Sequence, residues 1–281
     1  MRRERVSEDI YIFTSEMYAQ VTASVILTNE GAIVIDTLPF PVESRELAEF
    51  VYRRHRRGAR YIINTHYHAD HVYGNYLFPE AQIISHRLCR DALASVTEQQ
   101  LKKAKSETPA LSDVRLRIPT IVFDNEMGIN LGNRSLRLIH LPGHSPDGVG
   151  VYVDGERILF AGDAIMPIPY FGQGDHGTLR RTLQRIMDLK PENIIQGHGD
   201  TLLRGEITST LERHIEYLDC IEQEVKQVIK KRRGRNALKR ITLEQCGESS
   251  IPLDGLVRHL HQTNLTNLYN QMKGKKSKRR K

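Results

Sequence analysis

Several residue types are scarce in this chain of 281 residues, and each scarcity excludes a class of protein. There is no Trp, and three Cys are too few to hold a chain of this length together with disulfides. Gly (20) and Pro (11) occur at ordinary levels, which excludes collagen-like and low-complexity chains. With 39% hydrophobic residues, the chain is expected to fold around a conventional apolar core.

The cysteines also lack the spacing of a metal or redox motif. Cys89, Cys220 and Cys246 are widely separated and form no CxxC pair, so we expect reduced thiols. Long apolar runs are missing as well, because no segment approaches the roughly 18 to 20 residues of a membrane span. The N-terminus starts MRRER, but acidic residues follow where a signal peptide would be apolar. We therefore predict no membrane segment and a cytoplasmic location.

The net charge of +7 is unevenly distributed. Seven of the 41 basic residues lie in residues 273–281, which leaves 34 basic and 34 acidic residues in residues 1–272. The body of the protein is therefore neutral, and the excess charge belongs to a predicted disordered tail. A nucleic-acid contact through this tail is the alternative to a simply solvated end.

Hydrophobic patterning predicts two groups of strands with helices between and outside them. We expect strands at residues 10–13, 24–28, 32–36, 60–64, 82–85, 120–123, 128–131, 135–141, 148–153, 157–161 and 193–196. We expect helices at residues 41–55, 87–105, 179–189 and 206–233, with a short amphipathic helix after residue 251. This arrangement predicts stacked mixed sheets flanked by helices, in one domain with a C-terminal helical extension.

The most informative segment is THYHADH, residues 65–71, directly after a predicted strand. His66 and His68 are two residues apart and can project to one side, while Asp70 and His71 lie on the following turn. Imidazole and carboxylate ligands suit zinc, with iron or manganese as alternatives. The segment HxHxDH therefore predicts a metal site.

Three later strand ends carry further ligand-type residues. They are His144 in PGHSPD, Asp163 in AGDA and His198 in QGHG. Most of these residues lie next to a Gly, which allows close approach of the backbone. Four strand ends that each finish in a ligand-type residue point to one shared site.

In this order, the four motifs resemble those of the metallo-β-lactamase superfamily over residues 8–205. The resemblance implies an α+β fold, a four-layer αββα sandwich, with residues 1–205 as the catalytic domain, 206–272 as the helical extension and 273–281 as the basic tail. It implies two metal ions, most simply Zn²⁺, held by His66, His68 and His144 at the first site, by Asp70, His71 and His198 at the second, and bridged by Asp163. Asp36 would support the site from a turn rather than take part in catalysis.

The ligand set is similar to that of glyoxalase II-like and lactonase-like hydrolases. Such a site uses a metal-bridging hydroxide to attack an ester, thioester, lactone or amide carbonyl. Asp70 would be the catalytic residue that ligates a metal and orients the nucleophile. The partner would then be a small-molecule substrate.

Three other functions remain open. One is a mononuclear iron persulfide dioxygenase, and another is a phosphodiesterase or ribonuclease of the same superfamily. A β-CASP nuclease is disfavoured, because that type inserts a large domain before its final histidines. Here only 34 residues separate Asp163 from His198. The third is a binding module without catalysis, which the complete ligand set argues against.

Two tyrosines are candidate substrate contacts. The apolar loop 166–171 follows Asp163 and offers Tyr170 as a polar contact, whereas Tyr73 is either a substrate contact or a packing residue. His176 is expected on the surface. Five further histidines are expected to be structural or on the surface: His86, His140, His214, His259 and His261. The C-terminal helices either close the pocket or form a homodimer surface.

Overall fold

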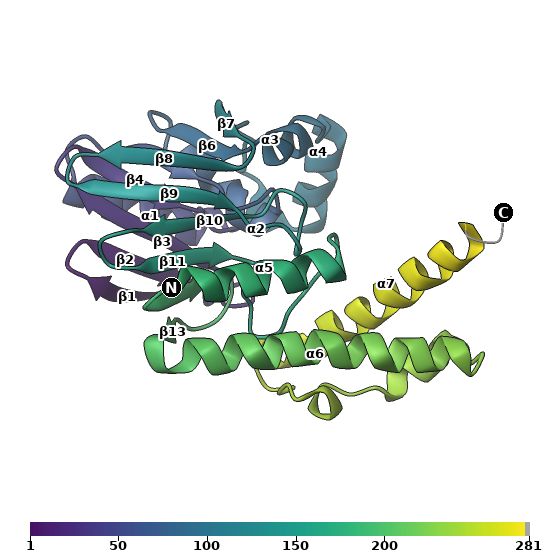
Figure 1. Ribbon diagram of the computed structural model, residues 1–281. Helices are drawn as coiled ribbons and strands as arrows, with labels where there is room; N and C mark the ends of the chain where they lie inside the picture. Colours follow the sequence, from purple (N-terminus) through teal and green to yellow (C-terminus); the bar gives the residue numbers. More distant parts are fainter. Residues whose placement is uncertain (279–281) are drawn as a thin grey trace.

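Two β-sheets stacked face to face form the centre of the protein, and helices cover their outer faces (Figure 1). The computed structural model describes the backbone of residues 1–278 and the side chains of residues 1–274. The predicted α+β class and four-layer αββα sandwich are confirmed. No helix in the described part of the chain combines the length and the apolarity that crossing a bilayer requires.

The first sheet has seven strands in the order of the sequence. They are β1 (Arg2–Ser7), β2 (Ile10–Thr14), β3 (Thr22–Thr28), β4 (Gly31–Ile35), β5 (Ala59–Ile63), β6 (Gln82–His86) and β7 (Ile121–Phe123). Strands β1 to β4 pair antiparallel, and β4 to β7 pair parallel. Because parallel strands share a direction, the loops that follow β4, β5 and β6 lie at one edge of the sheet.

The second sheet has six strands in the order β13-β12-β11-β10-β9-β8. They are β8 (Glu126–Leu131), β9 (Arg134–His140), β10 (Val149–Val153), β11 (Ile158–Gly162), β12 (Asn193–Gln196) and β13 (Leu202–Leu203). All neighbours pair antiparallel except β11 and β12, which pair parallel.

The helices divide between the two outer faces. They are α1 (Pro41–Arg54), α2 (Ala69–Val72), α3 (Arg87–Ala94), α4 (Glu98–Glu107), α5 (His176–Leu189), α6 (Arg204–Lys230) and α7 (Val257–Lys278). Short 3₁₀ turns are η1 (Tyr73–Leu77), η2 (Pro109–Leu111), η3 (Arg235–Arg240), η4 (Glu244–Cys246) and η5 (Leu253–Gly255). Helix α1 packs on the first sheet, and α5, α6 and α7 share one buried cluster on the second.

Alternation along the strands explains the layers. In β2, Ile10 and Ile12 face the core between the sheets, whereas Tyr11 and Phe13 face α1 on the outside. Successive side chains of a strand point to opposite faces, so a strand with apolar residues at every position is buried on both sides. All five residues of β2 are buried, as this reasoning requires.

Several elements differ from the sequence-based expectation, among them β13 and α2, which have no expected counterpart. Strand β1 was not expected, because its charged residues carry no apolar pattern; it is an edge strand paired only with β2. The expected helix at residues 87–105 is divided, because Thr97 caps α4 through a capping box with Gln100. Helix α7 continues to Lys278, so residues 273–278 are helical rather than a disordered tail, and residues 279–281 lie outside the described part. Lys is a good helix former, which permits this extension.

The expectation of reduced thiols is wrong for two of the three cysteines. Cys220 of α6 and Cys246 of η4 form a disulfide. The chain turns back along α6 after residue 230 and brings their Cα atoms to 5.5 Å, a proximity that the 26-residue spacing does not reveal. Cys89 is free and buried.

Candidate metal centre

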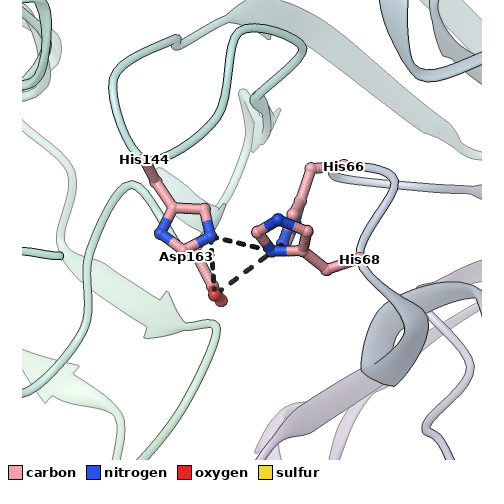
Figure 2. A group of neighbouring side chains, drawn as sticks. All are labelled: His66, His68, His144 and Asp163. Carbon is pink, nitrogen blue, oxygen red and sulfur yellow. Dashed lines mark hydrogen bonds and ion pairs between the residues drawn. The ribbon is translucent and has the colours of Figure 1, made fainter. Parts of the chain in front are cut away.

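Three histidines and one carboxylate form a first group at the edge of the sandwich (Figure 2). Nδ1 of His68 lies 3.0 Å from Nε2 of His66 and 3.0 Å from Nε2 of His144. Oδ2 of Asp163 lies 3.2 Å from Nε2 of His144. With metal bonds of about 2.0–2.1 Å, adjacent ligand atoms of a tetrahedral site lie about 3.3 Å apart, so these four atoms have the spacing of one ion's ligands.

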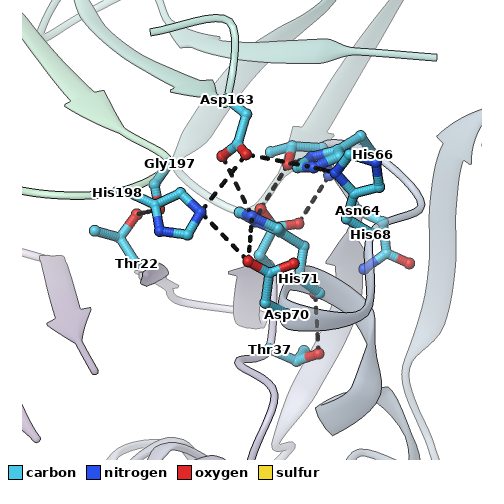
Figure 3. Close-up of polar contacts among 12 residues, drawn as sticks. Thr22, Thr37, Asn64, His66, His68, Asp70, His71, Asp163, Gly197 and His198 are labelled. Atoms are coloured by element: carbon cyan, nitrogen blue, oxygen red, sulfur yellow. Dashed lines mark hydrogen bonds and ion pairs between the residues drawn. The ribbon is translucent and has the colours of Figure 1, made fainter. Parts of the chain in front are cut away.

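A second group, formed by Asp70, His71 and His198, lies beside the first (Figure 3). Oδ2 of Asp70 is 3.3 Å from Nε2 of His198 and 3.7 Å from Nε2 of His71. The other oxygen of Asp163, Oδ1, is 3.3 Å from Nε2 of His71. One carboxylate therefore faces both groups, and the structure brings together all seven residues that the sequence motifs point to.

Loops at the ends of central strands supply these side chains. His66 and His68 follow β5, His144 follows β9, Asp163 follows β11, and His198 follows β12. The approach is tight, because a Cβ at Gly197 would collide with the Asp163 carboxylate. The site therefore requires a glycine before its last histidine.

Oxygen atoms behind the rings hold several of the histidines in orientation. His71 donates its Nδ1 proton to Asp36 at 2.7 Å, and Thr65 donates its hydroxyl proton to the same carboxylate at 2.6 Å. Nδ1 of His66 lies 3.1 Å from the Thr65 hydroxyl oxygen. Asp36 thus orients the ring of His71 directly and the ring of His66 through Thr65. It does so with a left-handed backbone (φ 56°), a conformation that Asp tolerates better than most residues.

Backbone carbonyls orient two more rings. His144 donates its Nδ1 proton to the carbonyl of Tyr170 at 2.9 Å, and His198 donates its Nδ1 proton to the carbonyl of Ala19 at 2.9 Å. Partners of this kind fix the tautomer, leaving Nε2 free to ligate an ion.

Mutual attraction between these carboxylates and imidazoles shifts their protonation equilibria. Burial opposes charge on Asp163, yet His198 and His71 hold the pKa of this carboxyl well below its usual range. The pKa of Asp70 falls to about 2 because of the same two histidines, despite burial. Burial opposes protonation of His198, but Asp163 and Asp70 raise its pKa to about 10. Burial lowers the pKa of His144 to about 4. Two ionised carboxylates suit a divalent cation, and binding one would displace the protons that the raised pKa values of His71 and His198 retain at neutral pH.

A cavity of about 390 Å³ opens onto both groups. Its floor includes His68, Asp70 and Asp163, and Tyr18 and Tyr170 lie at its sides. One wall comes from a distant part of the chain, the segment 253–260, and this wall consists mainly of leucine: Leu253, Leu256 and Leu260, with His259. The cavity therefore joins a cluster of ligand-type atoms to an apolar surface.

The predicted substrate contacts lie in different places. Tyr170 lines the cavity, with its ring 5.5 Å from that of His144. Tyr73 packs beside Val72 and is not among the residues lining this cavity in the described part of the chain. His176, expected on the surface, is buried and bonds through Nε2 to the carbonyl of Leu218.

Local motifs gave no signal for several cavity residues. Tyr18 follows an ordinary strand, and Leu256 and His259 lie far along the chain from the last ligand motif. Leu256 and His259 reach the cavity because of the way the start of α7 packs. Asn264 of α7 bonds the backbone of both Pro169 and Phe171, which fixes the loop that carries Tyr170.

Comparison with known proteins agrees with this geometry. The profile of the metallo-beta-lactamase superfamily matches residues 18–198. The acyl-coenzyme A thioesterase MBLAC2 of Bos taurus is 28% identical over 62% of this chain and 71% of its own length. The hydroxyacylglutathione hydrolase of Francisella tularensis subsp. novicida (strain U112) is 30% identical over 48% of this chain and 43% of its own length. Matches to further relatives, from human, fly and worm, span little more than half of their length.

Solved structures share the architecture. A metallo-beta-lactamase from Pontibacter korlensis superposes with a TM-score of 0.60, covering 75% of this chain and 97% of its own. Its sequence identity is 19%, so the likeness concerns the fold.

Proposed function

The chain belongs to the metallo-beta-lactamase superfamily of hydrolases, and on that premise we propose that it is a dinuclear metal-dependent thioesterase acting on acyl thioesters. The observation that carries the proposal is the junction of two ligand groups with an apolar wall in one cavity. The names of two relatives, a thioesterase and a hydroxyacylglutathione hydrolase, support the choice of a thioester.

The donor set fits two divalent ions of the zinc, iron or manganese type. It contains five imidazoles and two carboxylates and no thiolate, and we propose zinc as the simplest occupant. The first ion would be held by His66, His68 and His144, the second by Asp70, His71 and His198, with Asp163 between them. When bound, such ions lower the pKa of a shared water and polarise a carbonyl group.

Two side chains that line the cavity, Asp70 and Tyr170, can act on the water and on the substrate. Asp70 stays ionised down to a pH of about 2, so at neutral pH it can accept a hydrogen bond from the attacking water and orient it. Tyr170 has a pKa raised by burial and by Asp163, so its hydroxyl stays protonated and can donate to the substrate. No serine or cysteine nucleophile lines the cavity in the described part of the chain, which favours direct hydrolysis.

The leucine wall favours an apolar acyl group. Leu253 and Leu260 are largely buried, and Leu256 is 39% exposed at the rim. Burying an aliphatic acyl chain against this wall removes apolar surface from water, at about 25 cal/mol per Å². A charged or sugar-like group would gain nothing from it.

Metal analysis combined with a substrate panel tests the proposal. We expect about two zinc ions per chain and hydrolysis of acyl thioesters, detected by thiol release, with little activity on lactones, β-lactams and phosphodiesters. One iron per chain with oxygen uptake on a persulfide would favour the dioxygenase instead. Cleavage of phosphodiester probes alone would favour the nuclease. The homodimer, the contact of the tail with nucleic acid and the cytoplasmic location stay predictions.

A further inference from the structure

One ring nitrogen that faces away from the metal centre has no partner among the described residues. His68 directs Nδ1 toward Nε2 of His66 and Nε2 of His144. Its own Nε2 therefore points away from the centre, and this atom is buried without a hydrogen bond to any described residue. When Nδ1 ligates an ion, the neutral ring carries its proton on Nε2, which leaves a buried N–H donor without an acceptor.

The other four histidines do not share this defect. The ring nitrogen of each that faces away from the centre lies within hydrogen-bond distance of an oxygen: the Asp36 carboxylate, the Thr65 hydroxyl, or the carbonyl of Tyr170 or Ala19. Metal-ligating histidines almost always donate in this way, because the bond fixes the orientation of the ring and its tautomer. His68 is the exception among them.

A buried carboxylate close to His68 is an acceptor that lacks a hydrogen-bond donor in the described part of the chain. Asp147 is 1% exposed, and neither of its oxygens has a hydrogen bond of ordinary geometry. The fully buried hydroxyl of Ser145 is unpartnered as well. Two contacts place the stretch from His144 to Val149 beside His68: Val149 donates its N–H to the carbonyl of Thr65 at 2.7 Å, and Nε2 of His144 lies 3.0 Å from Nδ1 of His68. Burial raises the pKa of Asp147, and Ser145 and His68 oppose that rise. Unsatisfied buried groups are rare in proteins, and three in one place call for a shared partner.

We infer that Asp147 positions His68 for metal binding by accepting its Nε2 proton through one buried water molecule. The two side chains form no direct hydrogen bond, and a water between them would also reach the Ser145 hydroxyl. Three polar partners is the usual number for a buried water. The carboxylate then holds the proton on Nε2, keeps Nδ1 free for the ion and makes that nitrogen more basic.

The wild-type protein provides the first test. In zinc-loaded, ¹⁵N-labelled protein, long-range ¹H–¹⁵N correlations report which nitrogen of each histidine carries the proton. We expect His68 to be protonated at Nε2, with slow exchange of this proton against solvent. Protonation at Nδ1, or exchange as fast as that of an exposed histidine, overturns the inference.

Zinc affinity provides the second test, measured by competition with a chromophoric chelator. We expect Asp147→Asn to bind zinc about tenfold or more weakly than wild type. The matched control is Glu248→Gln, because Glu248 is also a buried carboxylate and bonds His214 at 2.8 Å, outside the set of ligand-type residues. Both variants should melt at lower temperature without metal, but only Asp147→Asn should lose zinc affinity.

The inference rests on the proposed metal centre, and the two can fail separately. A wild-type protein that binds no zinc overturns the proposed function and the inference with it. A wild-type protein that binds zinc no more tightly than Asp147→Asn overturns the role of Asp147 alone, as does an equal loss of affinity in Glu248→Gln.

Discussion

At the scale of single residues, Asp163 connects the two ligand groups. Its Oδ2 faces His144 and its Oδ1 faces His71, so one carboxylate is shared between them. Asp163→Asn keeps the size of the side chain and removes the charge. We expect kcat/KM for thioesters to fall by a factor on the order of a thousand, because the variant loses charge where two cations would bind.

The measurement is thiol release together with the zinc content of the variant. Asp200→Asn is the control, since this carboxylate is exposed and lies outside both groups. Turnover near the wild-type level in Asp163→Asn, with two ions retained, would contradict the shared role of the carboxylate.

The protonation of His198 predicts a pH dependence for the metal-free protein. Its pKa is raised on folding from 6.5 to about 10, mainly by Asp163 once the opposing effect of burial is overcome. A raised pKa stabilises the folded state below the unfolded value, and this contribution is lost as the pH rises toward 10. The melting temperature of metal-free protein should therefore decrease between pH 7 and pH 10. His198→Asn should flatten this dependence, and an equally steep decrease in that variant would speak against it.

At the scale of elements, we propose that the segment of η5 and the start of α7, which lines the cavity, selects the acyl group. Leu256→Asp should raise KM for a long-chain acyl thioester by about tenfold, with a smaller effect on acetyl thioester, because it removes apolar contact worth about 1.4 kcal/mol from a side chain at the cavity rim. Ile251→Asp is the matched control: Ile251 is 80% exposed on the same segment and does not line the cavity. Equal changes for short and long substrates would show that the wall does not select them.

A disulfide joins α6 to η4, the turn that precedes that segment in the chain. A bridge that closes a loop of 26 residues stabilises the folded state by about 3 kcal/mol in the chain-entropy description. Cys220→Ser should lower the free energy of unfolding by roughly that amount, as measured by urea denaturation without reductant. Reductant should destabilise wild type and leave the variant unchanged. Three titratable thiols in unfolded, unreduced protein would show that the bond is absent.

The sequence predicted those parts that depend on short-range pattern. The ligand residues were found because each follows a strand within one motif, and β2 to β6 were found because their apolar runs are uninterrupted. The leucine wall was not found, because Leu256 reaches the cavity only through the packing of α7 on α6. The disulfide was missed because the chain turns back along α6 after residue 230, which the spacing of the two cysteines does not reveal. Asp147 lies inside the PGHSPD motif, but its proposed role in positioning His68 follows only because the buried Nε2 of that histidine has no partner in the part of the chain that the structure describes.

At the scale of the whole molecule, the metal centre lies at the edge of a sandwich that has its own cores. The clusters between the sheets and on both outer faces contain none of the seven ligand-type residues. We expect removal of zinc by a chelator to lower the melting temperature while far-UV circular dichroism stays unchanged. At a zinc concentration of 100 times Kd, binding adds about 2.7 kcal/mol. Loss of secondary structure on chelation would contradict this view.

The superfamily match ends at residue 198, the last of the ligand-type histidines, and the leucine wall begins more than fifty residues later. The ligand-type residues and the leucine wall therefore belong to separate stretches of the chain. Grafting residues 241–260 from a relative onto this framework is therefore a direct way to redirect the enzyme.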